Sequence, residues 1–200
     1  MHLAAVVDSD PASRFISHKP RAAALMYAAH FAAGLAIKGC APKAPAWALL
    51  TGVFIADFVW ITLASMGVEP ADTQAYFDEW SHSCLSIILE ATIFALFFYR
   101  SGIQVWLPIW LATFSHFLLD WPIHPTPLAI YPHSDMHLGF HFWSWGLSKS
   151  MLGRTHYWWI QLGVLLILLA IYCWGASKGR IAWNLVAASC LIVFGLHFVF

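Results

Sequence analysis

Charged side chains are scarce in this 200-residue sequence: Asp, Glu, Lys and Arg make up 10% of it, and their formal charges sum to zero. Soluble domains carry roughly 25% charged residues, so the scarcity indicates a membrane protein. Without a net positive charge a nucleic-acid partner is not expected, because binding to phosphates needs a basic surface. Apolar residues are abundant instead, at 60%, and the 12 tryptophans fit the aromatic belts of a membrane protein.

Paired cysteines and common catalytic signatures are also missing. The four cysteines are scattered without a C-x-x-C pair, which argues against a disulfide framework or a thiolate metal site. There is no Gly-rich phosphate loop and no G-x-S-x-G nucleophile elbow. Residues 1–21 are mixed and polar, unlike a signal peptide, so we expect the whole chain to be mature.

Six apolar segments have about the length that a membrane span requires. They cover residues 22–39, 45–66, 82–99, 104–121, 157–176 and 181–200. The predicted fold class is therefore all-α, a polytopic membrane helical bundle of about six apolar helices that form five to six spans, the first being the least apolar. Residues 1–21 are predicted to be a polar N-terminal tail, and residues 22–200 a single membrane-embedded helical domain.

Residues 122–156 are predicted to be an extracytoplasmic loop and interfacial segment between helices four and five. Their first part is rich in proline, which cannot continue a helix, and their second part is rich in Trp and Phe, which favour the headgroup zone. We expect a lid over the site. His133, His137 and His141 would share one face of a helix starting at Pro132, but an interfacial polar role is favoured for them.

His116 and Asp120 lie four residues apart at the end of segment 104–121. On a helix this spacing places both side chains on one face, where an imidazole and a carboxylate can bind one divalent cation. Ionisable groups at the end of an apolar segment are costly to bury without a partner. The alternative is a hydrogen-bonded His–Asp couple that locks two helices together.

Three further ionisable side chains are expected to reach the same place. If the apolar segments cross the membrane in alternation, His30, Asp57 and His82 fall on the same leaflet as the pair. A cation there would offset the cost of burying two carboxylates. We therefore predict a metal site made of His30, Asp57, His82, His116 and Asp120.

Nitrogen and carboxylate ligands without thiolates suit zinc best, with manganese and iron as alternatives. Five ligands exceed what one tetrahedral ion with an open position uses, so the set also fits two ions bridged by a carboxylate. Glu90 is the only acid in segment 82–99. Three roles are open for it: metal ligand, general base, or protonated glutamate that bridges helices. His124 continues the four-residue step and would reach the site from a loop beyond Pro122, as a candidate for proton transfer.

The short turns on the side away from the predicted site are basic and hold no acid. They contain Lys38, Lys43, Arg100, Lys178 and Arg180. Because cytoplasmic loops of membrane proteins carry an excess of Lys and Arg, these turns are predicted to be cytoplasmic. The site would then face the periplasm or the outside.

Four motifs in a fixed order carry a resemblance that covers roughly residues 27–145. They are His30 with Gly34 and Lys38, Asp57 at the end of Gly52–Asp57, Ser81-His82-Ser83, and Ser115-His116-Phe-Leu-Leu-Asp120 with His124. Their order resembles small bacterial inner-membrane proteins classed as metal-dependent hydrolases, some of them LexA-regulated, which are distantly similar to zinc-dependent phospholipase C and S1/P1-type nucleases. The resemblance implies a helical metal site that hydrolyses a phosphoester, for example of a lipid. The sequence departs from that pattern at two positions. His141 stands where a smaller residue is expected, and Gln161 stands where some relatives carry an acid.

Two functions therefore stay open. The first is a membrane-embedded metal-dependent hydrolase with membrane lipids as partners. The second is a non-catalytic membrane subunit whose histidines ligate haem or a chlorophyll-type pigment, or only pack helices, and whose partners include other membrane-protein subunits.

Overall fold

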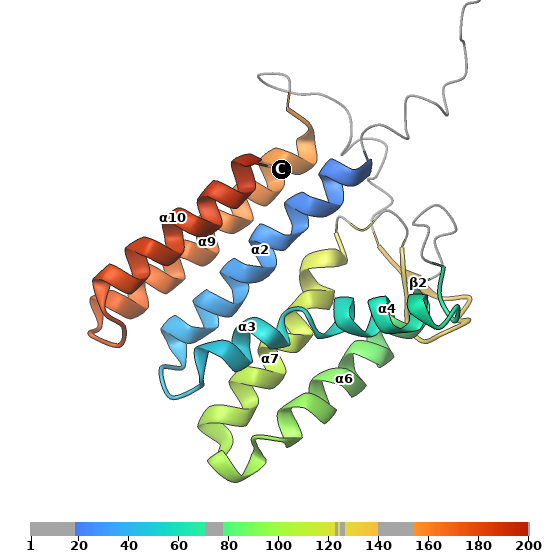
Figure 1. Ribbon diagram of the computed structural model, residues 1–200, viewed down its shortest axis with the longest axis horizontal. Helices are drawn as coiled ribbons and strands as arrows, with labels where there is room; N and C mark the ends of the chain where they lie inside the picture. Colours follow the sequence, from blue (N-terminus) through green and yellow to red (C-terminus); the bar gives the residue numbers. More distant parts are fainter. Residues whose placement is uncertain (1–18, 71–77, 123, 125–126, 140–153, 200) are drawn as a thin grey trace, which may run out of the picture.

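The structure is a computed structural model that describes residues 19–70, 78–122, 124, 127–139 and 154–199. Regular structure in those residues is helical apart from one short antiparallel strand pair (Figure 1). In chain order the elements are α2 (Lys19–Cys40), α3 (Ala46–Gly52), α4 (Ile55–Ser65), α5 (Glu79–His82), α6 (Cys84–Leu96), the 3₁₀ turn η1 (Tyr99–Ser101), α7 (Ile103–Asp120), β1 (Leu128–Ala129), β2 (His137–Leu138), α9 (His156–Ser177) and α10 (Trp183–Val199).

Helix α2 lies between two groups of helices (Figure 1). It packs against α9 and α10 on one side and against α3 and α7 on the other. Its small side chains, such as Ala28 and Ala32, are buried in one cluster with the larger Leu165 and Leu169 of α9. Small residues on one helix let the bulkier neighbour approach closely. Because α2 is shared by both groups, His30 in its middle is buried.

The closest approach of α2 and α9 is made by two glycines. A Cβ atom built on Gly175 would lie 2.5 Å from the Cα of Gly39, so only hydrogen fits there. Nearby, Arg180 donates a hydrogen bond to the carbonyl of Gly39 over 3.4 Å. The turn between α9 and α10 is thereby held next to the end of α2.

Helices α6 and α7 form a pair joined by η1, and α3 packs onto α7. Gly102, with φ +85°, makes the turn into α7 that a side chain would disfavour. Ser83 is extended, and its hydroxyl accepts a hydrogen bond from Ser86 N over 3.3 Å, so it caps α6 and separates that helix from α5. This break turns α5 and its His82 away from the axis of α6.

The prediction of five to six membrane spans is wrong. Among the described residues only α9 is long and apolar enough to cross a membrane, or α9 and one more if α3 and α4 are counted as a single bent span. Segment 45–66 is two helices bent by 50°, and segment 82–99 is divided at Ser83, which leaves α6 with 13 residues. The apolar segments predicted the helix positions to within a few residues. Breaks between helices and polar side chains within them leave most of the helices too short, or too low in mean hydropathy, to span a membrane.

The region between α7 and α9 also differs from the prediction. Its described part contains an antiparallel ladder with Leu128 opposite Leu138, so the fold is not purely helical. His133 has φ +61° and His137 lies in β2, so these two do not share a helical face. Glu79 of α5 accepts a hydrogen bond from His133 N and lies 3.4 Å from His137 Nε2. His141 and about half of the expected lid, residues 123, 125–126 and 140–153, lie outside the described residues.

Candidate metal centre

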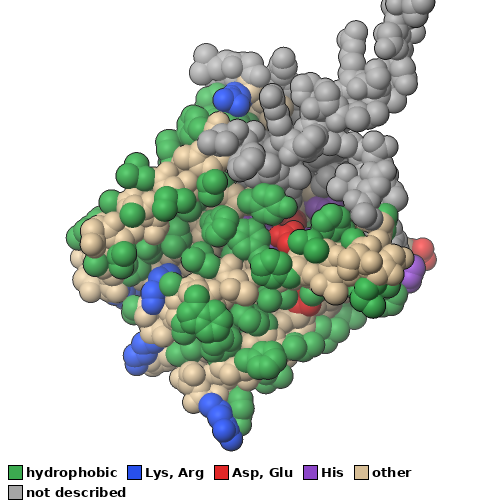
Figure 2. Space-filling model, viewed as in Figure 1, with side chains coloured by type: hydrophobic (Ala, Val, Ile, Leu, Met, Phe, Trp, Pro, Cys, Tyr) green, Lys and Arg blue, Asp and Glu red, His purple; other side chains and the backbone are tan. Residues whose placement is uncertain are grey.

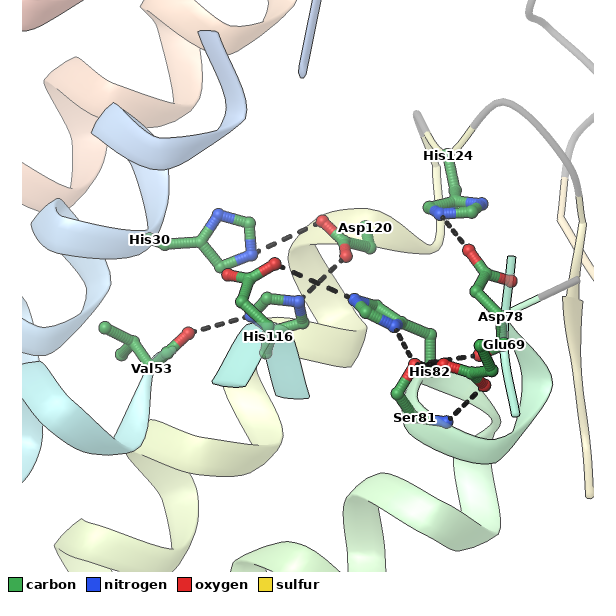
Figure 3. A network of polar contacts seen from close by, with 10 residues as sticks. His30, Val53, Glu69, Asp78, Ser81, His82, His116, Asp120 and His124 are labelled. Atoms are coloured by element: carbon green, nitrogen blue, oxygen red, sulfur yellow. Dashed lines mark hydrogen bonds and ion pairs between the residues drawn. The ribbon is translucent and has the colours of Figure 1, made fainter. Parts of the chain in front are cut away.

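His116 and Asp120 lie on the buried face of the last turns of α7, each 2% exposed. As their spacing predicts, they are one turn apart, and His116 Nε2 lies 3.1 Å from Asp120 Oδ2 (Figure 3). The other ring nitrogen, Nδ1, lies 2.8 Å from the backbone carbonyl oxygen of Val53. A carbonyl only accepts, so Nδ1 carries the hydrogen, and a neutral His116 presents its Nε2 lone pair to Asp120.

His30 reaches the same carboxylate from α2. Its Nε2 lies 3.3 Å from Asp120 Oδ1, and its ring centre is 4.3 Å from that of His116 (Figure 3). Each oxygen of Asp120 therefore faces one imidazole nitrogen, and the aspartate joins two helices that are distant in sequence. His30 is 2% exposed, so this part of the cluster is shielded from water.

Asp57 of α4 and His82 of α5 complete the cluster on its more open side. His82 Nε2 lies 3.9 Å from Asp57 Oδ1, and the ring centres of His82 and His116 are 5.2 Å apart. The side chain of Asp57 is 21% exposed, whereas that of His82 is 9% exposed. The cluster is thus accessible from the α4 side.

A second buried network orients His82. Its Nδ1 lies 2.7 Å from Ser81 Oγ, and that hydroxyl lies 2.8 Å from Glu69 Oε2 (Figure 3). The serine hydrogen goes to the carboxylate, so Ser81 Oγ accepts from His82 Nδ1–H. Glu69 is itself held by the backbone N–H groups of Trp80 and Ser81. His82 Nε2 is consequently left as a lone pair that points at the cluster, the tautomer that a metal ligand needs.

Hydrogen-bond acceptors of the cluster therefore face one another. In the neutral state His116 Nε2 and Asp120 Oδ2 both present lone pairs 3.1 Å apart, and Asp57 Oδ2 is buried without a hydrogen-bond partner among the described residues. Such contacts are unfavourable in a low-dielectric interior unless a proton or a metal cation lies between them. The donor set fits a cation on this ground.

Electrostatics shift the pKa values of three groups of the cluster in the metal-free protein. Burial would lower the pKa of His116, but the Asp120 carboxylate and its hydrogen bond raise it to about 9. Burial would raise the pKa of Asp120, but His116 and His30 hold it well below its usual range. Burial and the nearby charge of His116 lower the pKa of His82 to about 3. At neutral pH a proton therefore lies between His116 and Asp120, while His82 is neutral.

Among the described residues, two sets of three side chains are close enough to hold an ion: His30, His116 and Asp120, and Asp57, His82 and His116. Within each set the candidate ligand atoms lie within 4.8 Å of one another. The two sets share His116, whose Nδ1 is occupied by Val53. Only Nε2 is left to ligate, so the two sets cannot each hold an ion through His116.

The two residues predicted for proton transfer lie at the edge of the cluster. Glu90 of α6 has one carboxylate oxygen buried without a hydrogen-bond partner among the described residues. Burial raises its pKa to about 8, while the charge of His116 acts against that rise. His124 lies beyond the end of α7, with Nε2 3.1 Å from Asp78 Oδ2 and its ring 6.1 Å from that of His82. Neither belongs to the two metal-competent sets.

Sequence reasoning missed the residues that orient the histidines. Glu69 and Asp78 are not among the predicted site residues, and Val53 contributes through its backbone, which leaves no signature in the sequence. The available signal was Ser81, directly before His82, because a hydroxyl beside a candidate ligand can fix its tautomer. Gln161 of α9 is 3% exposed, and its Oε1 has no hydrogen-bond partner among the described residues, but it belongs to neither metal-competent set.

No family model, curated protein or solved structure matches the chain.

Proposed function

We propose that the His/Asp cluster binds one divalent transition-metal ion, and that the protein is a metal-dependent hydrolase acting on a phosphoester. One observation carries the proposal: a backbone carbonyl forces His116 to direct its Nε2 at a buried carboxylate 3.1 Å away. In an ordinary buried couple, the neutral imidazole would donate a hydrogen from Nε2 to the carboxylate. In His116 the hydrogen is on Nδ1, so a metal cation or an added proton is needed between Nε2 and the carboxylate.

Zinc is the ion that fits best. Each of the two sets offers two imidazoles and one carboxylate without thiolate, a donor set typical of zinc with an open position, with manganese and iron as alternatives. We propose one ion rather than the two considered from the sequence, because His116 is common to both sets and has one free nitrogen. Asp57 is the most exposed member, so the face of the ion toward α4 is the place for water and substrate.

The surrounding residues can support hydrolysis. A bound divalent ion would lower the pKa of a water molecule and polarise a phosphoryl oxygen. Glu90, on the rim of the cluster, would hold or release the proton of the attacking water. His124, which contacts Asp78, would protonate a leaving group. His30, His116 and Asp120, the most buried members, would anchor the ion.

We further propose that the protein belongs to the bacterial inner membrane, with α9 as its membrane helix. Support comes from the length and hydropathy of α9 and from the many exposed aliphatic side chains on the described helices. If α9 is the one span, the basic Lys178–Arg180 turn that follows it would be cytoplasmic, and the cluster, which precedes it in the chain, would face the periplasm. A reporter that works only in the cytoplasm, fused into residues 68–76, should be inactive; activity there would reverse the orientation.

A haem-binding role is not favoured by the geometry. The rings of His30 and His116 are 4.3 Å apart with a carboxylate beside both, so no macrocycle fits between them. A haem ligand also needs one or two histidines and no carboxylates. A Soret band in the purified protein would bring this alternative back.

The first experiment is metal analysis of the full-length protein purified in detergent without chelator. We expect one zinc ion per chain, and a loss of that ion in His116→Ala. The second experiment measures hydrolysis of bis-(p-nitrophenyl) phosphate and of phospholipids by the zinc-loaded protein, with His116→Ala as the inactive control. Absence of stoichiometric zinc, manganese and iron would refute the metal site. Stoichiometric metal without hydrolysis of any phosphoester would leave a metal-binding subunit and refute the hydrolase.

A further inference from the structure

The end of the molecule opposite the metal cluster carries a groove between the α2–α3 turn and the start of α7. It has a volume of about 380 Å³. Its lining is mostly apolar and includes Ile103, Leu107 and Pro108, with Lys43 and Gln104 as the polar side chains. Along α7, Gln104 is 12 residues from His116, or about 18 Å, so the groove is separate from the metal cluster.

One polar pair, Lys43 and Gln104, lies at this groove. Lys43 Nζ donates to Gln104 Oε1 over 2.6 Å, and both side chains are exposed. An ammonium group has three hydrogens, so two are left for another acceptor. The carbonyl of Gln104 faces the lysine, so its NH₂ group is a further donor beside it. Lysine and amide donors together suit a phosphate.

The charge around the groove has one sign. Arg100 in η1, Lys38 at the end of α2, and Lys178 and Arg180 in the α9–α10 turn belong to the same basic set of turns, which contain no acid. Figure 2 shows several Lys and Arg side chains along the lower left edge of the molecule and one near its top, whereas acidic and histidine side chains lie toward its centre and right. Exposed Trp174 lies under the cationic groups of Lys178 and Arg180, at 5.7 and 5.3 Å. Cations with exposed tryptophans are typical of the membrane–water interface.

An apolar stripe leads away from the groove along α7. Ile103, Leu107, Leu111 and Leu118 are between 39% and 54% exposed. Their spacing of four, four and seven residues places them on one face of the helix over about 22 Å. That length is close to one extended acyl chain. A phosphate site at one end of an exposed aliphatic stripe has the pattern of a phospholipid.

We propose that this groove binds one anionic phospholipid, with the phosphate at Lys43 and Gln104 and an acyl chain along the α7 stripe. The phospholipid accounts for both the donors and the stripe, whereas free phosphate would leave the stripe exposed and a second copy of the chain would leave the donors unused. The proposal does not depend on the metal site, because no metal-competent residue contributes to the groove.

Native mass spectrometry of the full-length protein in a non-ionic detergent tests the proposal by counting bound lipids. We expect one tightly bound dioleoyl phosphatidylglycerol and weaker binding of dioleoyl phosphatidylcholine. Lys43→Gln should weaken phosphatidylglycerol binding about tenfold, the effect of one charge-assisted hydrogen bond. Lys43→Arg should restore binding. Leu107→Asn should also weaken it, while Leu191→Asn on α10, which is 74% exposed in the parent chain, should not.

Lys178→Gln is the matched charge control, because it removes the same charge from the basic end but lies outside the groove. We expect it to change binding less than twofold. Equal losses in Lys43→Gln and Lys178→Gln would mean general attraction to charge and would overturn the proposal. Displacement of the lipid by millimolar inorganic phosphate would exclude the acyl-chain contact. A dimer that Leu107→Asn converts to a monomer would assign the stripe to self-association and would equally overturn it. Circular dichroism must show unchanged helicity in each variant.

Discussion

The two ends of the molecule hold ionisable or polar groups of two kinds. At the end with the His/Asp cluster, His30, His116 and Asp120 are each 2% exposed, and both histidines lie within 3.3 Å of the aspartate. At the basic end, Lys43 of the α2–α3 turn and Gln104 of α7 are exposed and contact each other at the surface. One end thus buries most of its ionisable groups, whereas the other keeps them hydrated.

The difference teaches how burial decides the role of a charge. A buried carboxylate needs its partners, because its desolvation is not repaid by water. A surface lysine keeps its hydration, so its contacts contribute little to stability and are available to a ligand. Substitutions in the buried cluster should therefore change folding and metal binding, whereas those at the basic end should change ligand binding alone.

The largest effect is expected for Asp120→Ala. Removing one partner of a buried ion pair leaves the other uncompensated, and we expect a loss of about 3 kcal/mol in the free energy of unfolding of the metal-free protein. The value lies at the low end of the usual range because His116 can release its proton. Chemical denaturation followed by circular dichroism measures it. Lys43→Gln at the basic end should stay within about 0.5 kcal/mol of wild type, and equal losses would break the comparison.

Zinc should stabilise the buried end and leave the basic end unaffected. For an ion that binds only the folded state, a hundredfold excess over Kd adds about 2.7 kcal/mol to the free energy of unfolding. Titration of zinc into chelated protein, with thermal unfolding as the measurement, should show this in wild type and in Lys43→Gln. His116→Ala should not respond. A zinc response of normal size in His116→Ala would place the ion elsewhere.

The network behind His82 should have a smaller effect, seen in zinc affinity. Glu69→Gln removes the carboxylate that holds the Ser81 hydroxyl, so His82 can change tautomer and zinc affinity should fall about ten- to a hundredfold. Glu79→Gln is the matched control, since Glu79 contacts His137 and His133 at the surface instead. Competition with a fluorescent zinc chelator gives both affinities. If the two variants bind zinc equally, the network does not position His82.

The smallest effect is the pH dependence of the metal-free protein. The pKa of His116 is raised from 6.5 to about 9, so its contribution to stability is complete below pH 6.5 and is lost as the pH rises through 9. Glu90 acts in the same direction, because its pKa is raised from 4.5 to about 8 and its neutral form is favoured in the fold. We expect a decline of about 2 kcal/mol between pH 6.5 and 9. Thermal unfolding of chelated His116→Ala should show a flatter profile, and an unchanged slope would contradict the assignment.

The locations of the helices could be predicted from the sequence, because apolar runs are local features. The positions of α7 and α9 differ by one residue from those of the apolar segments. Which of the helices are long enough to span a membrane could not be predicted in the same way. The bend between α3 and α4 and the cap at Ser83 shorten the helices, and a hydropathy pattern does not show such breaks. The convergence of His30, Asp57 and His82 on the α7 pair was expected from alternating spans, whereas the structure achieves it through helix packing.

The sequence by itself determined the His116–Asp120 pair, because residues four apart on a helix must share a face. It also determined the basic turns and the apolar stripe of α7. Only the tertiary structure decided that Val53 and Ser81 select the tautomers of His116 and His82, and that the two metal-competent sets of the described residues share His116. The physical reason is the range of the interactions. Helical spacing acts over a few residues, whereas a carbonyl 63 residues away or a carboxylate on another helix reaches the site only through packing.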